Sequence, residues 1–69
     1  MKLTLKAIRA NINLNQSEAA KRVGVSTDTW RNWENAKTFP DVEKIKKIEN
    51  EFGVAYNQII FLPNDTVKP

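Results

Sequence analysis

Cysteine and histidine are absent from this 69-residue chain, and glycine occurs only twice. Without the first two, the chain can form no disulfide bond and lacks the thiolate and imidazole ligands that most zinc sites use. It also lacks the side chain most often used as a general base. Two glycines are too few for a glycine-rich phosphate-binding loop. The sequence therefore predicts that the protein is not an enzyme and uses no metal, cofactor or small-molecule substrate.

Long hydrophobic runs are also missing. No apolar stretch approaches the ~20 residues of a membrane-spanning helix, and the opening segment MKLTLKAIRAN has no apolar block like that of a signal peptide. We therefore expect a soluble, cytoplasmic protein with no membrane partner. A chain of this length suits one small domain, which buries only about 60% of the surface that its unfolded chain exposes. Its stability is expected to be modest.

Charge is distributed unevenly along the chain. The formal net charge is +3, but residues 1–40 hold seven basic and three acidic side chains, a net +4, whereas residues 41–69 hold four basic and five acidic ones, a net −1. A basic N-terminal part is suited to the phosphates of a nucleic acid. Because many unrelated small proteins are equally basic, the charge supports such a partner without identifying it.

Asn15–Lys37 is the most informative stretch, with the sequence NQSEAAKRVGVSTDTWRNWENAK. Asn15 is a good N-cap, because its side-chain oxygen can accept a hydrogen bond from an unpaired amide in the first turn of a helix. Gly24 stands where a helix ends in a left-handed residue, and Ser26 can cap a second helix that runs to about Asn35. The pattern predicts two short helices joined by a tight turn.

The second of these helices has two unlike faces. Trp30 and Trp33 fall on its inner face, which makes base stacking by either tryptophan unfavourable. Its outer face carries only polar side chains, namely Thr27, Asp28, Arg31 and Asn32. A polar, hydrogen-bonding face after a glycine-containing turn is typical of a helix-turn-helix that reads base edges in the major groove of DNA.

These motifs resemble the phage repressor/Cro-type helix-turn-helix family, also described as XRE-like or lambda repressor-like. The shared features are an NQ opening, A-x-x-V-G-V-S across the turn, W-x-x-W-E-N-x-K at the end of the second helix, a proline before the next helix and G-V after it. The resemblance implies an all-α, compact five-helix domain over residues 1–62, with a tail at 63–69. It also implies a sequence-specific transcriptional regulator of phage or mobile-element origin, a repressor or Cro-like protein that binds a palindromic double-stranded DNA operator as a homodimer.

Three further helices are predicted around this motif. The first spans Leu3–Ile12, the fourth runs from an Asp41 cap to about Phe52, and a short fifth covers Tyr56–Ile60. The fifth is expected to begin weakly, because an alanine precedes it where a capping side chain is preferred. Lysines and glutamates alternate on the fourth helix, which favours a solvated surface over a phosphate-binding cluster. The side chains expected to face the core are Leu5, Ile8 and Ile12 in the first helix and Val42, Ile45, Ile48 and Phe52 in the fourth.

Three positions depart from the family pattern. Ala19 replaces a larger aliphatic residue, often leucine, and Trp30 replaces an aliphatic residue such as isoleucine. Because packing tolerates volume-conserving exchanges best, we predict that the Trp30 indole fills the space above Ala19. Ala36 stands where the family often has glycine with a positive φ. Either Asn35 takes that conformation instead, or the loop is rerouted.

The resemblance and the helix geometry together assign the candidate DNA contacts. Arg31 is expected to pair with guanine, Asn32 with adenine and the Thr27 methyl with thymine, whereas Asp28 either accepts from a cytosine amine or only favours the helix N-terminus by its charge. Phosphate contacts are expected from Arg9, Gln16, Ser17, Asn35 and Lys37. The resemblance further implies that Arg9 pairs with Glu34 rather than remaining a solvated charge.

The C-terminal apolar residues have two interpretations. Family members commonly dimerise through this region, so the resemblance assigns the dimer interface to Tyr56, Ile59, Ile60, Phe61 and Leu62. Alternatively, Phe61 and Leu62 fold back on the core of their own domain.

Two functions of different kinds remain. The polar outer face and its basic surroundings favour a DNA-binding regulator. The alternative is an antitoxin-like protein-interaction module that keeps the helix-turn-helix fold. Such a module needs an extra binding segment or an exposed apolar patch, for which the sequence offers only Phe61–Leu62.

Overall fold

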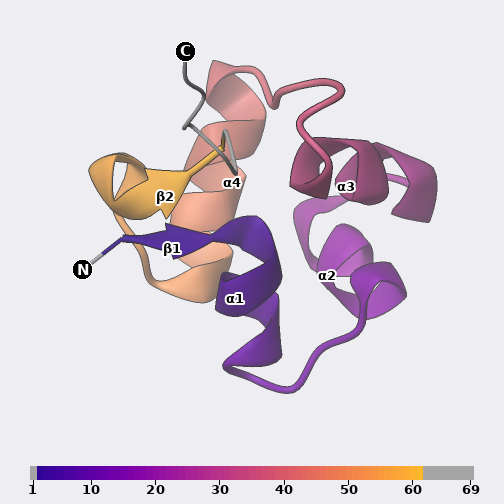
Figure 1. The fold of residues 1–69 in the computed structure, drawn as a ribbon, viewed down its shortest axis with the longest axis horizontal. Coiled ribbons are helices and arrows are strands. Elements are labelled where there is room, and N and C mark those ends of the chain that lie inside the picture. The colour runs from indigo at the N-terminus through magenta and orange to yellow at the C-terminus, as the bar shows by residue number, and fades with distance from the viewer. Residues whose placement is uncertain (1, 62–69) are drawn as a thin grey trace, which may run out of the picture.

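The computed structural model describes residues 2–61, which fold into four α-helices, one turn of 3-10 helix and a two-stranded sheet (Figure 1). Their order is β1 (Leu3–Thr4), α1 (Leu5–Ala10), α2 (Gln16–Val23), α3 (Thr27–Glu34), α4 (Val42–Phe52), η1 (Tyr56–Gln58) and β2 (Ile59–Ile60). Figure 1 places α2 and α3 together at one end of the long axis, with the sheet at the other. None of these helices has the length and hydropathy needed to cross a membrane.

The two helices of the motif begin and end at the predicted signals. The Asn15 side chain accepts from the Glu18 amide at 2.8 Å, and the Asn15 amide donates to the Glu18 carboxylate at 2.9 Å, which makes a reciprocal capping box. Gly24 ends α2 with a φ of 84°, a conformation that side chains with a Cβ rarely adopt. Ser26 caps α3 by accepting from the Thr29 amide at 3.1 Å. The predicted helix-turn-helix is confirmed.

Helix α1 is shorter than predicted at both ends. Leu3 and Thr4 belong to β1, and the Thr4 hydroxyl caps the helix by accepting from the Ala7 amide at 3.1 Å. After the helix the chain turns at Asn13, which has a φ of 60°, a value that asparagine tolerates better than most residues. Ile12 therefore lies beyond the helix and is 44% exposed, so its predicted place in the core is wrong.

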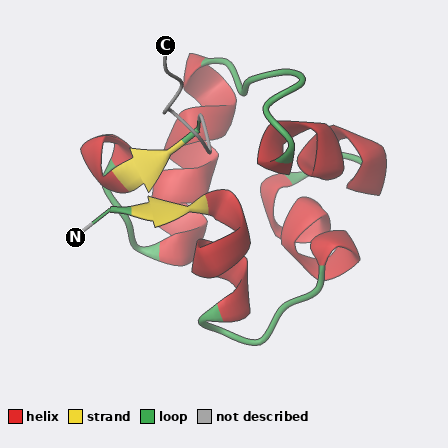
Figure 2. Ribbon diagram, in the orientation of Figure 1, coloured by secondary structure: helices red, strands yellow, loops and turns green. Residues whose placement is uncertain are grey.

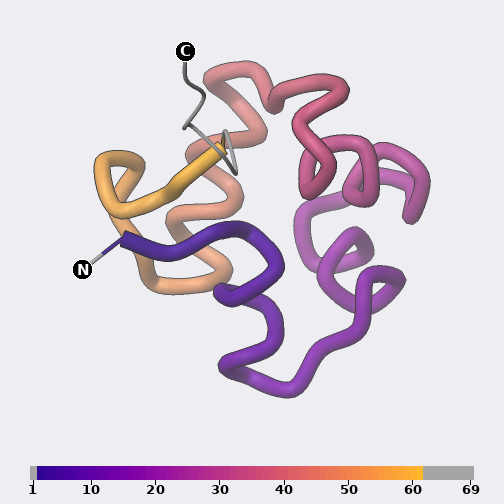
Figure 3. The backbone as a smooth tube through the Cα atoms, viewed as in Figure 1, coloured from indigo at the N-terminus to yellow at the C-terminus, as the bar shows by residue number. Residues whose placement is uncertain are grey.

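The predicted fifth helix is also wrong. Tyr56–Gln58 make one turn of 3-10 helix without a side-chain cap at Ala55, and Ile59–Ile60 continue as a strand. This strand pairs in parallel with β1, with Leu3 opposite Ile59, and the two segments run side by side in Figure 3. β-Branched isoleucines suit the pleated surface of a sheet, and the pairing supplies backbone partners that a short uncapped helix lacks. The domain is therefore mostly helical, with four α-helices instead of five.

The core takes its buried side chains from all four helices and from β2, which are coloured by type in Figure 2. Its buried members are Leu5, Ile8, Ala19, Ala20, Val23, Trp30, Trp33, Ile48 and Ile59. Along α4, burial of the apolar side chains decreases toward the N-terminus of the helix. Ile48 is fully buried, Ile45 is half-buried, and Val42 in the first turn is 71% exposed. The first turn of α4 thus extends past the core, and the predicted burial of Val42 is wrong.

Ala19 and Trp30 offer a test of compensating volumes. Both side chains are fully buried in the neighbouring helices α2 and α3. We expect Ala19→Leu alone to overpack the core and cost about 1–3 kcal/mol of unfolding free energy, and Trp30→Ile alone to leave a cavity. The double variant should recover part of the combined loss in chemical denaturation. Additive losses would show that the two side chains do not share a pocket.

Candidate nucleic-acid interface

Helix α3 is oriented by its two tryptophans. Trp30 is fully buried and Trp33 is 4% exposed. Their ring centroids lie 5.8 Å apart, and Trp30 lies equally close to Phe52 of α4. Aromatic side chains of this size bury a large apolar area, so they fix the rotation of α3 about its axis. The opposite face of α3 is therefore held toward solvent.

That opposite face carries the four predicted base-reading residues. Asp28 and Arg31 are exposed, whereas Thr27 and Asn32 are half-buried. The Arg31 Nη1 donates to the Asp28 Oδ1 at 2.5 Å, one turn away on the same helix. This exposed pair adds little stability, but it holds the guanidinium near the start of α3. No other donor of Arg31 bonds to a protein group within the described residues.

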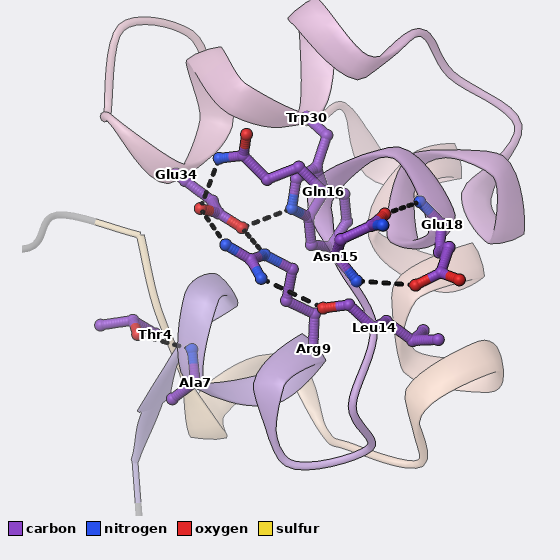
Figure 4. Close-up of polar contacts among 9 residues, drawn as sticks. All are labelled: Thr4, Ala7, Arg9, Leu14, Asn15, Gln16, Glu18, Trp30 and Glu34. Carbon is purple, nitrogen blue, oxygen red and sulfur yellow. Dashed lines mark hydrogen bonds and ion pairs between the residues drawn. The ribbon is translucent and has the colours of Figure 1, made fainter.

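The C-terminal end of α3 is fixed by a network centred on Glu34 (Figure 4). Its Oε2 accepts from the Arg9 Nε and from the Trp30 Nε1, each at 2.5 Å. Its Oε1 accepts from the Gln16 Nε2 at 3.0 Å and from the Arg9 Nη2 at 3.3 Å. The Arg9 Nη1 donates to the Leu14 carbonyl at 3.1 Å. One carboxylate thus joins α1, α2 and α3, and the predicted Arg9–Glu34 pair is confirmed.

The surroundings of Glu34 favour its charged form. Its side chain is only 6% exposed, and that of Arg9 is 15% exposed. Burial raises the pKa of Glu34, but hydrogen bonds from Arg9, Gln16 and Trp30, together with the charge of Arg9, outweigh burial, so that pKa lies below the usual value of a glutamate. The network therefore holds a carboxylate, not a carboxylic acid, at neutral pH.

Two of the five residues predicted to contact DNA phosphates, Arg9 and Gln16, belong to this network. Every side-chain nitrogen of Arg9 donates to Glu34 or Leu14, and the Gln16 amide nitrogen donates to Glu34. The other three candidates, Ser17, Asn35 and Lys37, are exposed. Helical spacing gives a signal for the Trp30–Glu34 bond, which joins residues four apart, but no local pattern links Gln16 to Glu34.

In the loop after α3, the positive φ for which the family often uses glycine arises in neither of the expected ways. Ala36 itself takes the left-handed conformation, with a φ of 61°, while Asn35 ends the helix at a φ of −93°. The Lys37 amide then donates to the Asn32 carbonyl at 2.9 Å, which closes the loop. Both predicted alternatives for this position are wrong, and an alanine carries the strain that glycine avoids.

We expect Ala36→Gly to raise the free energy of unfolding by about 0.5–1 kcal/mol. Relief of the left-handed strain exceeds the extra entropy that glycine gives the unfolded chain. Asn35→Gly is the matched control, because Asn35 has a negative φ and should gain nothing. Equal changes in the two denaturation midpoints would contradict the strain at Ala36.

The predicted dimer residues do not form one exposed surface. Tyr56 is 55% exposed, but Ile59 is 8% exposed and belongs to the chain's own core. Ile60 and Phe61 are half-buried, and Phe61 packs against the core while its ring lies 6.0 Å from that of Tyr56. Leu62 lies outside the described residues, as does the predicted tail at 63–69.

Comparison with known proteins gives one family match. A family model described as helix-turn-helix matches residues 5–59, the range from the first residue of α1 to the first residue of β2. Searches of curated proteins and of solved structures found no match.

Proposed function

Since the chain belongs to the XRE-type helix-turn-helix family of DNA-binding transcription regulators, we propose that it recognises a specific palindromic operator as a homodimer. In this proposal it acts as a repressor or Cro-like regulator of phage or mobile-element origin. Its α3 lies in the major groove, and two copies read the two half-sites.

The observation that carries this proposal is the division of α3 into two faces. Its two tryptophans are buried in the core, where Trp30 packs against Phe52 of α4, and the side chains opposite them all have hydrogen-bonding groups. Base edges in the major groove present donors, acceptors and the thymine methyl, which these side chains can match. The Glu34 network fixes the far end of the same helix, so the reading side chains are displayed on a rigid element.

Direct readout is divided among three residues. The unpaired edge of the Arg31 guanidinium suits the O6 and N7 of guanine, Asn32 suits adenine, and the Thr27 methyl suits thymine. Asp28 orients Arg31 and can also accept from a cytosine amine at the next base pair.

Phosphate contacts set the docking register. Ser17 lies in the first turn of α2, where unpaired amides and the helix dipole favour an anion. Asn35 and Lys37 lie at the exit from α3. Arg9 and Gln16 act in this proposal mainly through Glu34, by holding α1 and α2 against α3, and Arg9 adds positive potential behind the phosphates.

Lys37→Ala should weaken binding to specific and non-specific duplexes alike. A phosphate contact carries no sequence information, and its loss should lower the slope of log affinity against log salt by about one unit for each bound copy. A salt titration with an operator duplex and a scrambled duplex measures both quantities. A loss confined to the operator would show that Lys37 reads a base instead.

Selection of binding sites from random duplex DNA tests the proposed function directly. We expect an enriched palindrome with two half-sites about one helical turn apart. Failure to enrich any sequence would overturn sequence-specific recognition and favour the antitoxin-like interaction module.

A further inference from the structure

Exposed apolar side chains gather in one place on the described surface. Among the described residues, four large apolar side chains are exposed. Ile12 lines neither pocket, whereas Phe39, Val42 and Tyr56 line two adjoining surface pockets of ≈ 290 and ≈ 300 Å³. Ile45 and Tyr56 belong to both pockets. We call this surface the α4 groove. Its charged rim is Lys46 and Glu49, and its apolar walls are Phe39, Pro40, Val42, Ile45, Tyr56 and Phe61.

The α4 groove is unusual for a solvated surface. Val42 and Phe39 are 71% and 53% exposed, and they line adjoining pockets, whereas exposed apolar residues are normally scattered singly. The groove also differs from the C-terminal surface that the family resemblance suggested, because Ile59 is buried within its own domain. Among the described residues of that C-terminal surface, Tyr56 and Phe61 also line the groove.

The rim of the groove has charges of both signs. Lys46 and Glu49 line the same pocket, one turn apart on α4. The Glu49 carboxylate is held there, because its Oε2 accepts from the Tyr56 amide at 2.8 Å. In a two-fold interface, if one residue of the first copy contacts a second residue of the other copy, the reciprocal contact also forms. Two such rims can therefore form two Lys46–Glu49 pairs around a shared apolar centre.

We propose that a second copy of this chain covers the α4 groove. The proposal deepens the proposed function, on which it rests in one respect: an operator with two half-sites requires two copies. One eight-residue α3 reads only a few base pairs, so a pair of copies multiplies both contacts and specificity. The groove begins at Phe39, two residues after Lys37, so the loop that holds the phosphate contact leads directly into the interface.

Val42→Lys is the first test. Because Val42 is 71% exposed, this change should leave the fold of a single copy intact, while it places one cation from each copy in the apolar centre. Sedimentation equilibrium, without DNA and with a palindromic duplex, should show a dimer for the unaltered protein. The variant's dissociation constant should rise on the order of 100-fold, about tenfold for each copy. Glu43→Lys, the next residue on α4 and outside the groove, is the matched control and should leave the dimer intact.

A charge exchange identifies the occupant. Lys46→Glu and Glu49→Lys should each weaken self-association, because each brings like charges together across the two-fold axis. Mixing the two variants should restore a dimer containing one copy of each, since both pairs are then complementary. A misfolded Glu49→Lys variant would not be rescued in this way, so the mixture separates lost pairing from lost folding.

Two results would overturn the proposal. One is a monomer under all conditions, including on the palindromic duplex. The other is a dimer that Val42→Lys leaves unchanged, which would place the interface elsewhere. Neither result depends on base recognition. If a monomeric Val42→Lys variant still selects a half-site from random DNA, sequence-specific recognition by this domain stands. If the protein is a dimer with no sequence preference, the interface stands and the proposed function does not.

Discussion

Glu34→Ala is expected to lower the free energy of unfolding by about 2–4 kcal/mol. The substitution removes the acceptor for four hydrogen bonds from Arg9, Gln16 and Trp30. It leaves the guanidinium of Arg9, whose side chain is 15% exposed, without its counterion, and it leaves the buried Trp30 indole without an acceptor. Such groups have lost their hydration without gaining a partner, which is the costly outcome. Denaturation by urea, followed through tryptophan fluorescence, measures the loss.

Glu43→Ala is the matched control for this experiment. Glu43 is exposed on α4 and makes no ion pair within the described residues, so its removal should change stability by less than about 0.5 kcal/mol. Similar denaturation midpoints for the two variants would show that the Glu34 network is dispensable. Arg9→Ala should cost less than Glu34→Ala, because Gln16 and Trp30 keep their acceptor.

The same carboxylate gives stability a pH dependence of known sign. The folded-state pKa of Glu34 lies below its unfolded value, so its contribution is complete above the unfolded pKa and is lost as pH falls through the folded pKa. Glu34→Gln removes this titration. Its unfolding free energy should therefore change less than that of the unaltered protein below about pH 4.

Local signals predicted the helix-turn-helix well because its ends depend on neighbouring residues. Asn15, Gly24 and Ser26 each act on amides or backbone angles within a few positions, so their effect can be read from the sequence. The β1–β2 pair is different. Leu3 and Ile59 come from opposite ends of the described chain, and a helical pattern at either end reveals nothing of such a partner.

The candidate site also has features that local sequence predicts and features that depend on distant parts of the chain. Helical periodicity was enough to place Arg31 and Asn32 opposite Trp30 and Trp33. The Glu34 network was only partly predictable, because Gln16 enters it from another helix. The exposure of Val42 depends on where the core stops along α4, and amphipathic spacing alone does not give that limit. The α4 groove could not be predicted for the same reason.

Arg31→Ala is expected to weaken binding to the selected operator by about 1–3 kcal/mol for each half-site and to relax the preference at one or two base pairs there. Arg31 is the longest hydrogen-bonding side chain on the outer face of α3, and Asp28 already holds one edge of its guanidinium. The remaining donors can therefore meet guanine O6 and N7 with little further ordering. The measurement is affinity for the operator and for duplexes substituted at each base pair, across a salt series.

Lys47→Ala separates base reading from a general loss of positive charge. Lys47 is an exposed cation on α4 outside the proposed DNA contacts and outside the α4 groove, so its removal should leave base preference unchanged. Asp28→Ala should keep the preference for guanine at the Arg31 position but weaken it, because the guanidinium is no longer held. If Arg31→Ala lowers affinity equally for operator and scrambled duplex, Arg31 is a phosphate contact. The reading residues must then be Thr27 and Asn32, with Asp28 serving only the start of α3.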